Sequence, residues 1–211
     1  MSESEATSLP EAVSVKRPDR EAISLLYDSP HSGRVYPEDF GHAVDERLLV
    51  GGEDRFVDDL VIDAPSHGAT LVKALFARTY IDPNRMPNEL DPELLPQDWT
   101  DEIAPSLSAQ RGVGLIFRMI GESVPIYDRM LTTQEVRHRI DAYWRPYHQA
   151  LEDETERLLS ASGTVFHINW HSMQSVGNAL APDPGEKRAD FVLGDLEGRS
   201  CAPAFTRFVA E

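Results

Sequence analysis

The chain has 211 residues, of which 41 % are hydrophobic and 27 % charged, and its net charge is −16 at pH 7. This length fits one globular domain with a sizeable core, and the acidic balance argues against a protein that binds nucleic-acid phosphates. No apolar run is close to the length of a membrane span, which is about 20 residues. The single cysteine, Cys201, excludes an internal disulfide. We therefore expect a cytoplasmic protein with no nucleic-acid or membrane partner.

The beginning of the chain predicts a tail followed by a strand. Residues 1–20 are rich in Ser, Glu, Ala and Pro and lack the basic and apolar regions of a signal peptide. We expect them to form a mobile tail, ahead of a single domain over residues 21–211. Residues 21–28 are a strand candidate that leads into His31, where a turn begins.

The predicted elements between this strand and residue 131 are short. Helical spacing and apolar runs assign most of them, and a segment rich in proline and acids predicts a long surface loop. They are helices over Glu46–Leu49 and residues 53–62, strands over residues 68–72, 74–81 and 113–119, and a loop over residues 86–105.

The clearest helix is predicted over residues 132–160, where apolar side chains recur at helical spacing. Thr132 or Thr133 can cap its beginning. Pro146 should kink or divide it, and Gly163 should end it.

A second strand that leads to a histidine is predicted after this helix. Residues 164–170 are apolar at alternate positions and run into His171. We then expect a loop over residues 177–189, a short strand over 191–193 and a helix from residue 204. Strands and helices alternate throughout, which favours an α/β fold, a three-layer αβα sandwich with a mainly parallel mixed sheet.

The two histidines stand in matching places. His31 and His171 each follow a predicted strand and precede a serine. Ligands bind at the carboxyl ends of strands in open α/β sheets, so the two imidazoles can meet at one metal or one substrate. A catalytic zinc takes His, His and carboxylate ligands and keeps one position open, and Glu53 or Asp54 offers the carboxylate. The alternative is that both histidines are structural.

Residues 78–85, with the sequence Arg-Thr-Tyr-Ile-Asp-Pro-Asn-Arg, form a second polar group. One guanidinium and an amide can hold a substrate carboxylate, and the other guanidinium can stabilise an oxyanion. Asp82 can orient either arginine. The alternative is a pair of surface arginines.

Five motifs together resemble those of the N-formylglutamate amidohydrolases, from about residue 25 to the C-terminus. They are Ser29-Pro30-His31-Ser32-Gly33, Glu53-Asp54-x-x-Val57-Asp58-x-Leu60, Arg78-x-Tyr80-Ile81-Asp82-Pro83-Asn84-Arg85, Pro146-Tyr147-His148 and His171-Ser172-Met173. The resemblance implies a zinc-carboxypeptidase-like (phosphorylase/hydrolase-like) fold, in a wider group that includes aspartoacylase-type deacylases.

The resemblance also implies the metal site. It assigns one zinc ion to His31, Asp54 and His171. Asp54 is preferred to Glu53 because the family pattern keeps an aspartate at that place, although the neighbour stays an alternative. Histidine and carboxylate ligands also accept iron, manganese or cobalt.

The substrate site follows from the same resemblance. Asn84 and Arg85 would bind the substrate carboxylate, and Arg78 would assist the scissile carbonyl as the catalytic arginine. The implied reaction is hydrolysis of N-formyl-L-glutamate, or of a related small anionic N-acyl amino acid, to the free amino acid and formate or another acid, as in histidine degradation. A peptidase or amidase of the same zinc fold is the second interpretation.

The chain departs from the family pattern in two places. Asn169 stands where the family has an aspartate, two residues before the second histidine. The family glutamate that acts as general base has no match before Glu211. We therefore expect a fragment of a longer chain, another acid in that role, or an inactive member that binds a metal and a carboxylate.

Two further histidines have predicted environments. His148 belongs to the family pattern and is expected to make a structural hydrogen bond. His167 lies on the predicted strand that leads to His171, and contact between His167 and the metal is an alternative. Asp190 and Asp195 either line the substrate pocket or are turn residues.

Overall fold

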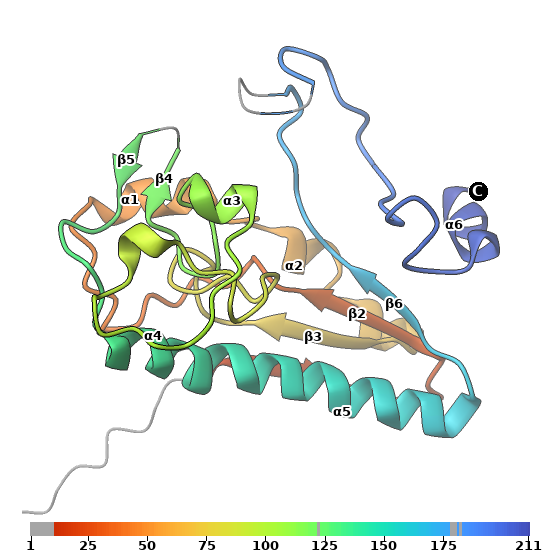
Figure 1. The fold of residues 1–211 in the computed structure, drawn as a ribbon. Helices are drawn as coiled ribbons and strands as arrows, with labels where there is room; N and C mark the ends of the chain where they lie inside the picture. Colours follow the sequence, from red (N-terminus) through yellow and green to blue (C-terminus); the bar gives the residue numbers. More distant parts are fainter. Residues whose placement is uncertain (1–10, 122, 178–180, 182) are drawn as a thin grey trace, which may run out of the picture. The chain divides into compact units, whose positions relative to one another are not determined.

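A mainly parallel mixed sheet organises the first part of the chain (Figure 1). The computed structural model describes residues 11–121, 123–177, 181 and 183–211, which divide into one compact unit ending at Ser172 and another over Met173–Glu211. The expectation of a single domain over residues 21–211 stays a prediction.

Within the described residues, the sheet has the strand order β1-β3-β2-β6. Its central strand β2 pairs in parallel with both β3 and β6, whereas β1 pairs antiparallel with β3. This arrangement confirms the prediction of an α/β fold with a mainly parallel mixed sheet. The strands are β1 (Val13–Lys16), β2 (Leu25–Ser29), β3 (Thr70–Ala74) and β6 (Phe166–Asn169).

Strand β1 lies within the segment predicted to be a tail, so that prediction is wrong for Val13–Lys16. Val13 and Val15 alternate with polar residues, which is the pattern of a strand with one solvated face. Beyond the strand, the Arg17 side chain donates to the Glu154 carboxylate, with 2.8 Å from Nε to Oε1. The backbone pairing with β3 outweighs the polar composition, while residues 1–10 lie outside the described residues.

The long helix is present in three parts. α4 (Thr133–Arg139) runs into a π-helical turn, η4 (Ile140–Trp144), and then into α5 (Arg145–Ser162). Thr132 caps α4 in a capping box with Glu135, and Gly163 ends α5 in the left-handed conformation with φ 74°. Pro146 has no N–H and its ring crowds the carbonyl four residues earlier. A wider turn directly before it accommodates both effects.

α5 lies along one face of the sheet and contacts β1, β2 and β3 (Figure 1). Its buried Tyr147 and Leu158 join Leu26 and Val72 of the sheet in one hydrophobic core. This helix therefore supports the strands that carry the candidate site.

The remaining elements are short, and α1 has the predicted bounds. They are α1 (Glu46–Leu49), η1 (Val50–Gly52), α2 (Val57–Leu60), η2 (Ala64–His67), η3 (Pro92–Leu94), α3 (Leu107–Gln110), β4 (Met119–Ile120), β5 (Val124–Pro125) and α6 (Pro203–Ala210). None of the helices in the described part of the chain is long and apolar enough to span a membrane.

The helix predicted over residues 53–62 is reduced to α2. Phe56 takes the left-handed conformation with φ 69° and separates α2 from the residues before it. Val57 and Val61 are buried as predicted, but Phe56 and Leu60 are 62 % and 77 % exposed. The apolar stripe thus contributes two side chains to the interior instead of four.

Three predicted strands differ from the structure. Beyond Ala74, which ends β3, residues 75–81 form only a single bridge, from Phe76 to Val35. Before Met119, which begins β4, residues 113–118 contain one bridge, and residues 191–193 are irregular. Phe76, Tyr80 and Ile81 are nevertheless fully buried. The apolar run therefore signalled burial rather than strand pairing.

The unit Met173–Glu211 contains α6, which confirms the helix predicted from residue 204. Part of the predicted loop over residues 177–189 lies outside the described residues. The unit exposes large apolar side chains, among them Phe191, Leu196 and Phe208.

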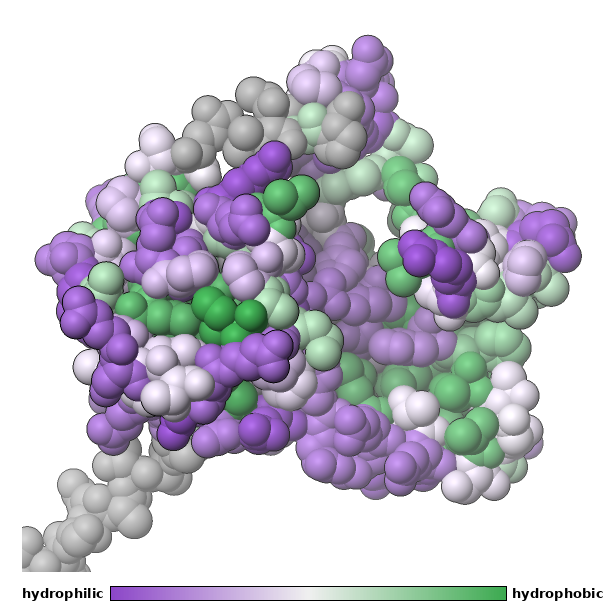
Figure 2. Space-filling view, viewed as in Figure 1, coloured by the Kyte–Doolittle hydropathy of each residue, from purple (hydrophilic) through white to green (hydrophobic). Residues whose placement is uncertain are grey.

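Hydrophilic side chains predominate on the face of the molecule drawn in Figure 2, as the charge of the chain suggests.

Candidate active site

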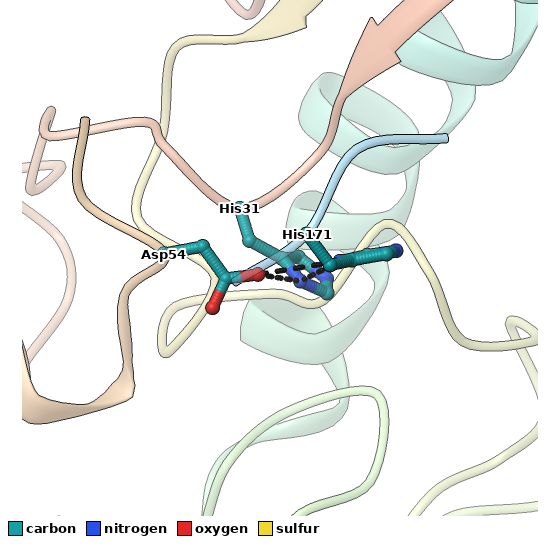
Figure 3. Close-up of side chains that lie close together, drawn as sticks. All are labelled: His31, Asp54 and His171. Atoms are coloured by element: carbon teal, nitrogen blue, oxygen red, sulfur yellow. Dashed lines mark hydrogen bonds and ion pairs between the residues drawn. The ribbon is translucent and has the colours of Figure 1, made fainter. Parts of the chain in front are cut away.

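Three side chains from distant parts of the sequence converge at the carboxyl end of the sheet: His31, Asp54 and His171 (Figure 3). The Nδ1 atoms of the two histidines are 3.0 Å apart, and each lies 3.2 Å from Oδ2 of Asp54. His31 and Asp54 are buried, whereas the His171 side chain is 34 % exposed. One side of the group is therefore open to a ligand.

The sheet brings the two histidines together. β2 and β6 are parallel neighbours with Asp28 opposite Asn169. His31 and His171 follow these residues closely, so both leave the sheet at the same edge.

Hydrogen bonds tie the loop of Asp54 to the loop of His31. The Asp54 N–H donates to the His31 carbonyl at 3.0 Å, and the Ser32 hydroxyl donates to the Asp54 carbonyl at 2.8 Å. Gly33 allows this loop to lie against the backbone after β3, because a Cβ at Gly33 would be 2.1 Å from the Phe76 carbonyl oxygen.

The donor set fits a zinc ion. A tetrahedral ion with bonds of about 2.1 Å holds its ligand atoms roughly 3.4 Å apart, and the three facing atoms here are 3.0–3.2 Å apart. Nε2 of His31 lies 2.8 Å from Oδ1 of Asp82 and donates its proton to that carboxylate. In the neutral ring this leaves Nδ1 with the lone pair that a metal needs.

Asp82, which lies within the arginine segment, links that segment to His31, one of the three candidate metal ligands. Its side chain is fully buried and accepts hydrogen bonds from His31 Nε2 at 2.8 Å, from Arg78 Nη2 at 2.7 Å and from the Asn84 N–H at 2.8 Å. One carboxylate therefore orients a candidate metal ligand, the candidate catalytic arginine and the backbone of a candidate substrate-binding residue.

Both buried carboxyl groups are held in the charged form. Burial raises the pKa of Asp54, but the nearby imidazoles of His171 and His31 and the guanidinium of Arg78 lower it by more. Burial likewise raises the pKa of Asp82, and the hydrogen bonds and charges of His31 and Arg78 outweigh it. The pKa of each group lies well below its usual range, so each stays an acceptor at neutral pH.

Both arginines lie beside the site. Arg78 Nη1 is 3.8 Å from Oδ1 of Asp54, and its guanidinium lies over the Phe117 ring. Arg85 is less constrained, with Nε 4.0 Å from Asp82 and Nη1 3.4 Å from Glu89. The buried Nε atoms of both arginines have no hydrogen-bond partner among the described residues.

Asn84 is exposed and links the arginine segment to the open side of the site. Its amide nitrogen lies 3.3 Å from Nε2 of His171, and its amide oxygen accepts from Asn169 at 3.3 Å. Asn169, which stands where the family pattern has an aspartate, thus contacts His171 through Asn84 rather than directly. All six candidate residues, His31, Asp54, Arg78, Asn84, Arg85 and His171, lie in one connected group.

Glu53 points elsewhere. Its carboxylate accepts from the Tyr36 hydroxyl and from Arg55 Nε, and its side chain is fully buried. Burial, helped by the Glu53 carboxylate, raises the pKa of Tyr36, so the phenol keeps its proton and donates it. The geometry therefore favours Asp54 as the carboxylate of the group.

The other predicted polar residues have separate partners. His148 Nε2 donates to the Pro83 carbonyl at 2.8 Å, as expected of a structural hydrogen bond. His167 lies 2.7 Å from Asp28 and is not part of the group. Asp195, in the second unit, accepts from the Gly198 N–H and is a turn residue.

Sequence reasoning missed two features. Asp28 on β2 is buried and accepts from the Tyr147 hydroxyl at 2.6 Å, which only the packing of α5 on the sheet reveals. Trp144 Nε1 donates to the Arg85 carbonyl at 2.9 Å, and nothing in the sequence near Trp144 signals this bond.

Comparisons with known proteins agree on one family. The family model of N-formylglutamate amidohydrolase matches residues 23–211. The N-formylglutamate deformylase of Pseudomonas putida is 29 % identical over 184 residues, which are 86 % of this chain, and that of Pseudomonas aeruginosa is 28 % identical over 188 residues, which are 88 % of it. The chain covers 62 % and 64 % of the lengths of these two relatives.

A solved structure is also similar. The N-formylglutamate amidohydrolase of Ralstonia eutropha JMP134 superposes with a TM-score of 0.87 at 43 % identity, over 94 % of this chain and 71 % of that one. The family model spans most of the chain, and the described fold matches that of a solved amidohydrolase. The chain belongs to the N-formylglutamate amidohydrolase family.

Proposed function

We propose that this chain is a metal-dependent hydrolase that cleaves the amide of N-formyl-L-glutamate, or of a closely related small N-acyl amino acid, to give the free amino acid and formate or another acid. The observation that carries the proposal is the triangle of two imidazole nitrogens and one carboxylate oxygen beside two arginines. The names of the relatives supply the substrate class.

His31, Asp54 and His171 would hold one zinc ion. Zinc bound there supplies a Lewis acid and lowers the pKa of a bound water. Asp54 contributes the negative charge, and Asp82 keeps the Nδ1 atom of His31 directed at the site. The three-layer zinc-carboxypeptidase-like architecture belongs to the same proposal, with α5 as the helical layer on one face of the sheet.

Arg78 would stabilise the charge that develops on the scissile carbonyl oxygen. Its guanidinium is held between Asp82 and Asp54, so it is oriented before the substrate arrives. Arg85 and Asn84 would bind the substrate carboxylate. Arg85 has unused donors on a partly exposed side chain, which suits an incoming carboxylate.

A second function is favoured by a specific observation. In the described part of the chain, the carboxylates bonded to the two histidines of the group are Asp54 and Asp82, and both are engaged in hydrogen bonds. Because both are committed to these contacts, neither is free to act as the general base. A family member that binds a metal and a carboxylate without turnover is therefore the second candidate.

The test is formate release from N-formyl-L-glutamate by the zinc-loaded chain, after chelation, and after zinc is restored. We expect release that follows zinc. Zinc content should be one ion per chain in the wild type and in the surface control His67→Ala, and should be lost in His31→Ala and His171→Ala. Zinc binding without formate release would favour the second candidate, and unchanged zinc content in both site variants would refute the metal site.

A further inference from the structure

The long helix holds the substrate segment by its backbone. Three side chains from this helix donate to carbonyl oxygens of residues 80–85. They are Arg139 to Tyr80 at 3.1 Å, His148 to Pro83 at 2.8 Å and Trp144 to Arg85 at 2.9 Å. This segment belongs to no strand or helix. Its other backbone bonds include one from the Asp82 N–H to the Leu115 carbonyl at 2.7 Å and local turn bonds to Asp82. The carbonyls of Pro83 and Arg85 are therefore fixed from the helix side by these side chains.

Trp144 and His148 act as a pair. Their ring centroids are 3.9 Å apart and their planes are inclined by 31°. Their acceptors are the carbonyls on either side of Asn84, with Pro83 buried and Asn84 exposed. The two stacked rings thus hydrogen-bond to the backbone at both ends of Asn84–Arg85, the two residues proposed to bind the substrate carboxylate.

The π-turn explains how the helix reaches this segment at several points. Arg139 and His148 are nine positions apart, and at about 100° per residue an unbroken α-helix would direct them about 180° apart. The π-turn η4 takes in one extra residue, so the nine positions cover the rotation of eight. The two side chains then differ by about 80°, and both can face residues 80–85.

The side chains of the substrate pair are otherwise weakly held. Asn84 makes two contacts of 3.3 Å, and Arg85 makes contacts of 3.4 and 4.0 Å. Their placement therefore depends mainly on the backbone, which turn bonds to Asp82 hold on one side and Trp144 and His148 hold at the carbonyls of Arg85 and Pro83. A displacement of about 1 Å in a binding group is enough to lose much of its contribution.

We propose that Trp144 and His148, brought into register by the π-turn, are positioning residues that set the affinity for the substrate carboxylate. The inference rests on the proposed role of Asn84 and Arg85. Neither aromatic residue touches the three candidate metal ligands in any described contact, so the effect should fall on carboxylate binding and not on zinc.

The experiment compares Trp144→Phe, His148→Phe and His148→Gln with the wild type, each as the zinc-loaded chain of 211 residues. Phenylalanine keeps a ring and removes the donor, whereas glutamine keeps an N–H at a similar reach. Matched controls are Trp99→Phe and His42→Phe, which remove comparable bonds of 2.9 Å to carbonyls away from the site. Affinity for L-glutamate is measured by calorimetry, which needs no turnover, together with KM and kcat for N-formyl-L-glutamate.

Each lost hydrogen bond should weaken L-glutamate binding and raise KM by about three- to tenfold, with kcat and zinc affinity within about twofold of wild type. His148→Gln should recover most of the loss, and the controls should match the wild type. Hydrolysis of the uncharged dimethyl ester of N-formyl-L-glutamate should not respond.

Equal affinities in wild type and variants, or equal losses in the controls, would overturn the inference. If the wild type binds L-glutamate but releases no formate, the proposed hydrolysis fails while the affinity comparison still decides the role of the pair. If the wild type binds no L-glutamate, there is no carboxylate site to position, and the inference is overturned.

Discussion

Replacing Asp82 with asparagine should weaken zinc binding without changing any candidate ligand. The carboxylate of Asp82 accepts from three N–H groups, on His31, Arg78 and the Asn84 backbone, at 2.7–2.8 Å. Asparagine has almost the same shape but offers one oxygen, so its amide N–H₂ must face at least one of these donors. The site also loses the negative charge that favours a cation.

The size of the effect follows from the contact to His31. Partners that orient a ligand imidazole typically change metal affinity by about 10- to 100-fold, which is about 1.4–2.8 kcal/mol. Asp82 is fully buried, so water cannot replace the lost acceptor. We therefore expect the upper half of this range.

The assay is competition for zinc between the protein and a chelator of known affinity. Asp28→Asn is the matched control, because Asp28 is equally buried and accepts from the Tyr147 hydroxyl and from His167, but it contacts none of the three candidate ligands. Its zinc affinity should stay within about twofold of wild type. Unchanged zinc affinity in Asp82→Asn, or an equal loss in Asp28→Asn, would refute the reasoning.

Two further predictions concern charged groups. Arg85→Ala should raise KM for N-formyl-L-glutamate by about 10- to 100-fold, because it removes hydrogen bonds to a charged group. The exposed control Arg47→Ala should leave KM unchanged. An unchanged KM in Arg85→Ala would contradict the proposed role of Arg85. Hydrogen bonds from Arg129, partly opposed by burial, lower the pKa of Glu135 from 4.5 to about 2. A carboxyl group whose pKa is lower in the folded state stabilises the protein at pH values above its unfolded pKa. This stabilisation is lost as the pH falls through the folded pKa. Urea unfolding should therefore find Glu135→Gln less stable than wild type at pH 7, with the difference vanishing between about pH 4.5 and 2; a constant difference would contradict it.

Elements with strong local signals could be predicted from the sequence. The long helix carries regular apolar spacing and a capping box at Thr132, and Gly163 ends it as expected. Strand β2 begins with a short apolar run, and in β6 the apolar residues Phe166 and Ile168 alternate with polar ones. In each case the local preference and the tertiary environment agree.

Elements decided by packing could not be predicted. Phe76, Tyr80 and Ile81 are apolar because they fill the core from irregular backbone, and hydrophobicity alone does not distinguish this from a strand. Strand β1 was missed because four residues with two polar side chains give too weak a signal. The π-turn before Pro146 depends on how the whole helix fits the segment below it.

The candidate site was predictable as a set of residues but not as a network. The motifs selected His31, Asp54 and His171, and the structure brings these three together. The shared role of Asp82 needs knowledge of which donors meet at one buried carboxylate, and the part of Trp144 needs the register of the helix. Such links depend on tertiary contacts that single-sequence patterns do not contain.

The close packing at Gly33 bears on how mutational maps of this protein should be interpreted. A Cβ at Gly33 would collide with the Phe76 carbonyl, although the backbone there lies outside the left-handed region and would otherwise suit any residue. Even alanine must push the turn that carries His31 away from the sheet. In a saturation screen for activity, position 33 would therefore score as intolerant as a ligand, although its own atoms bind nothing. Loss of activity at this position would reflect a steric collision that displaces the turn carrying His31, not a direct role of Gly33 in binding or catalysis.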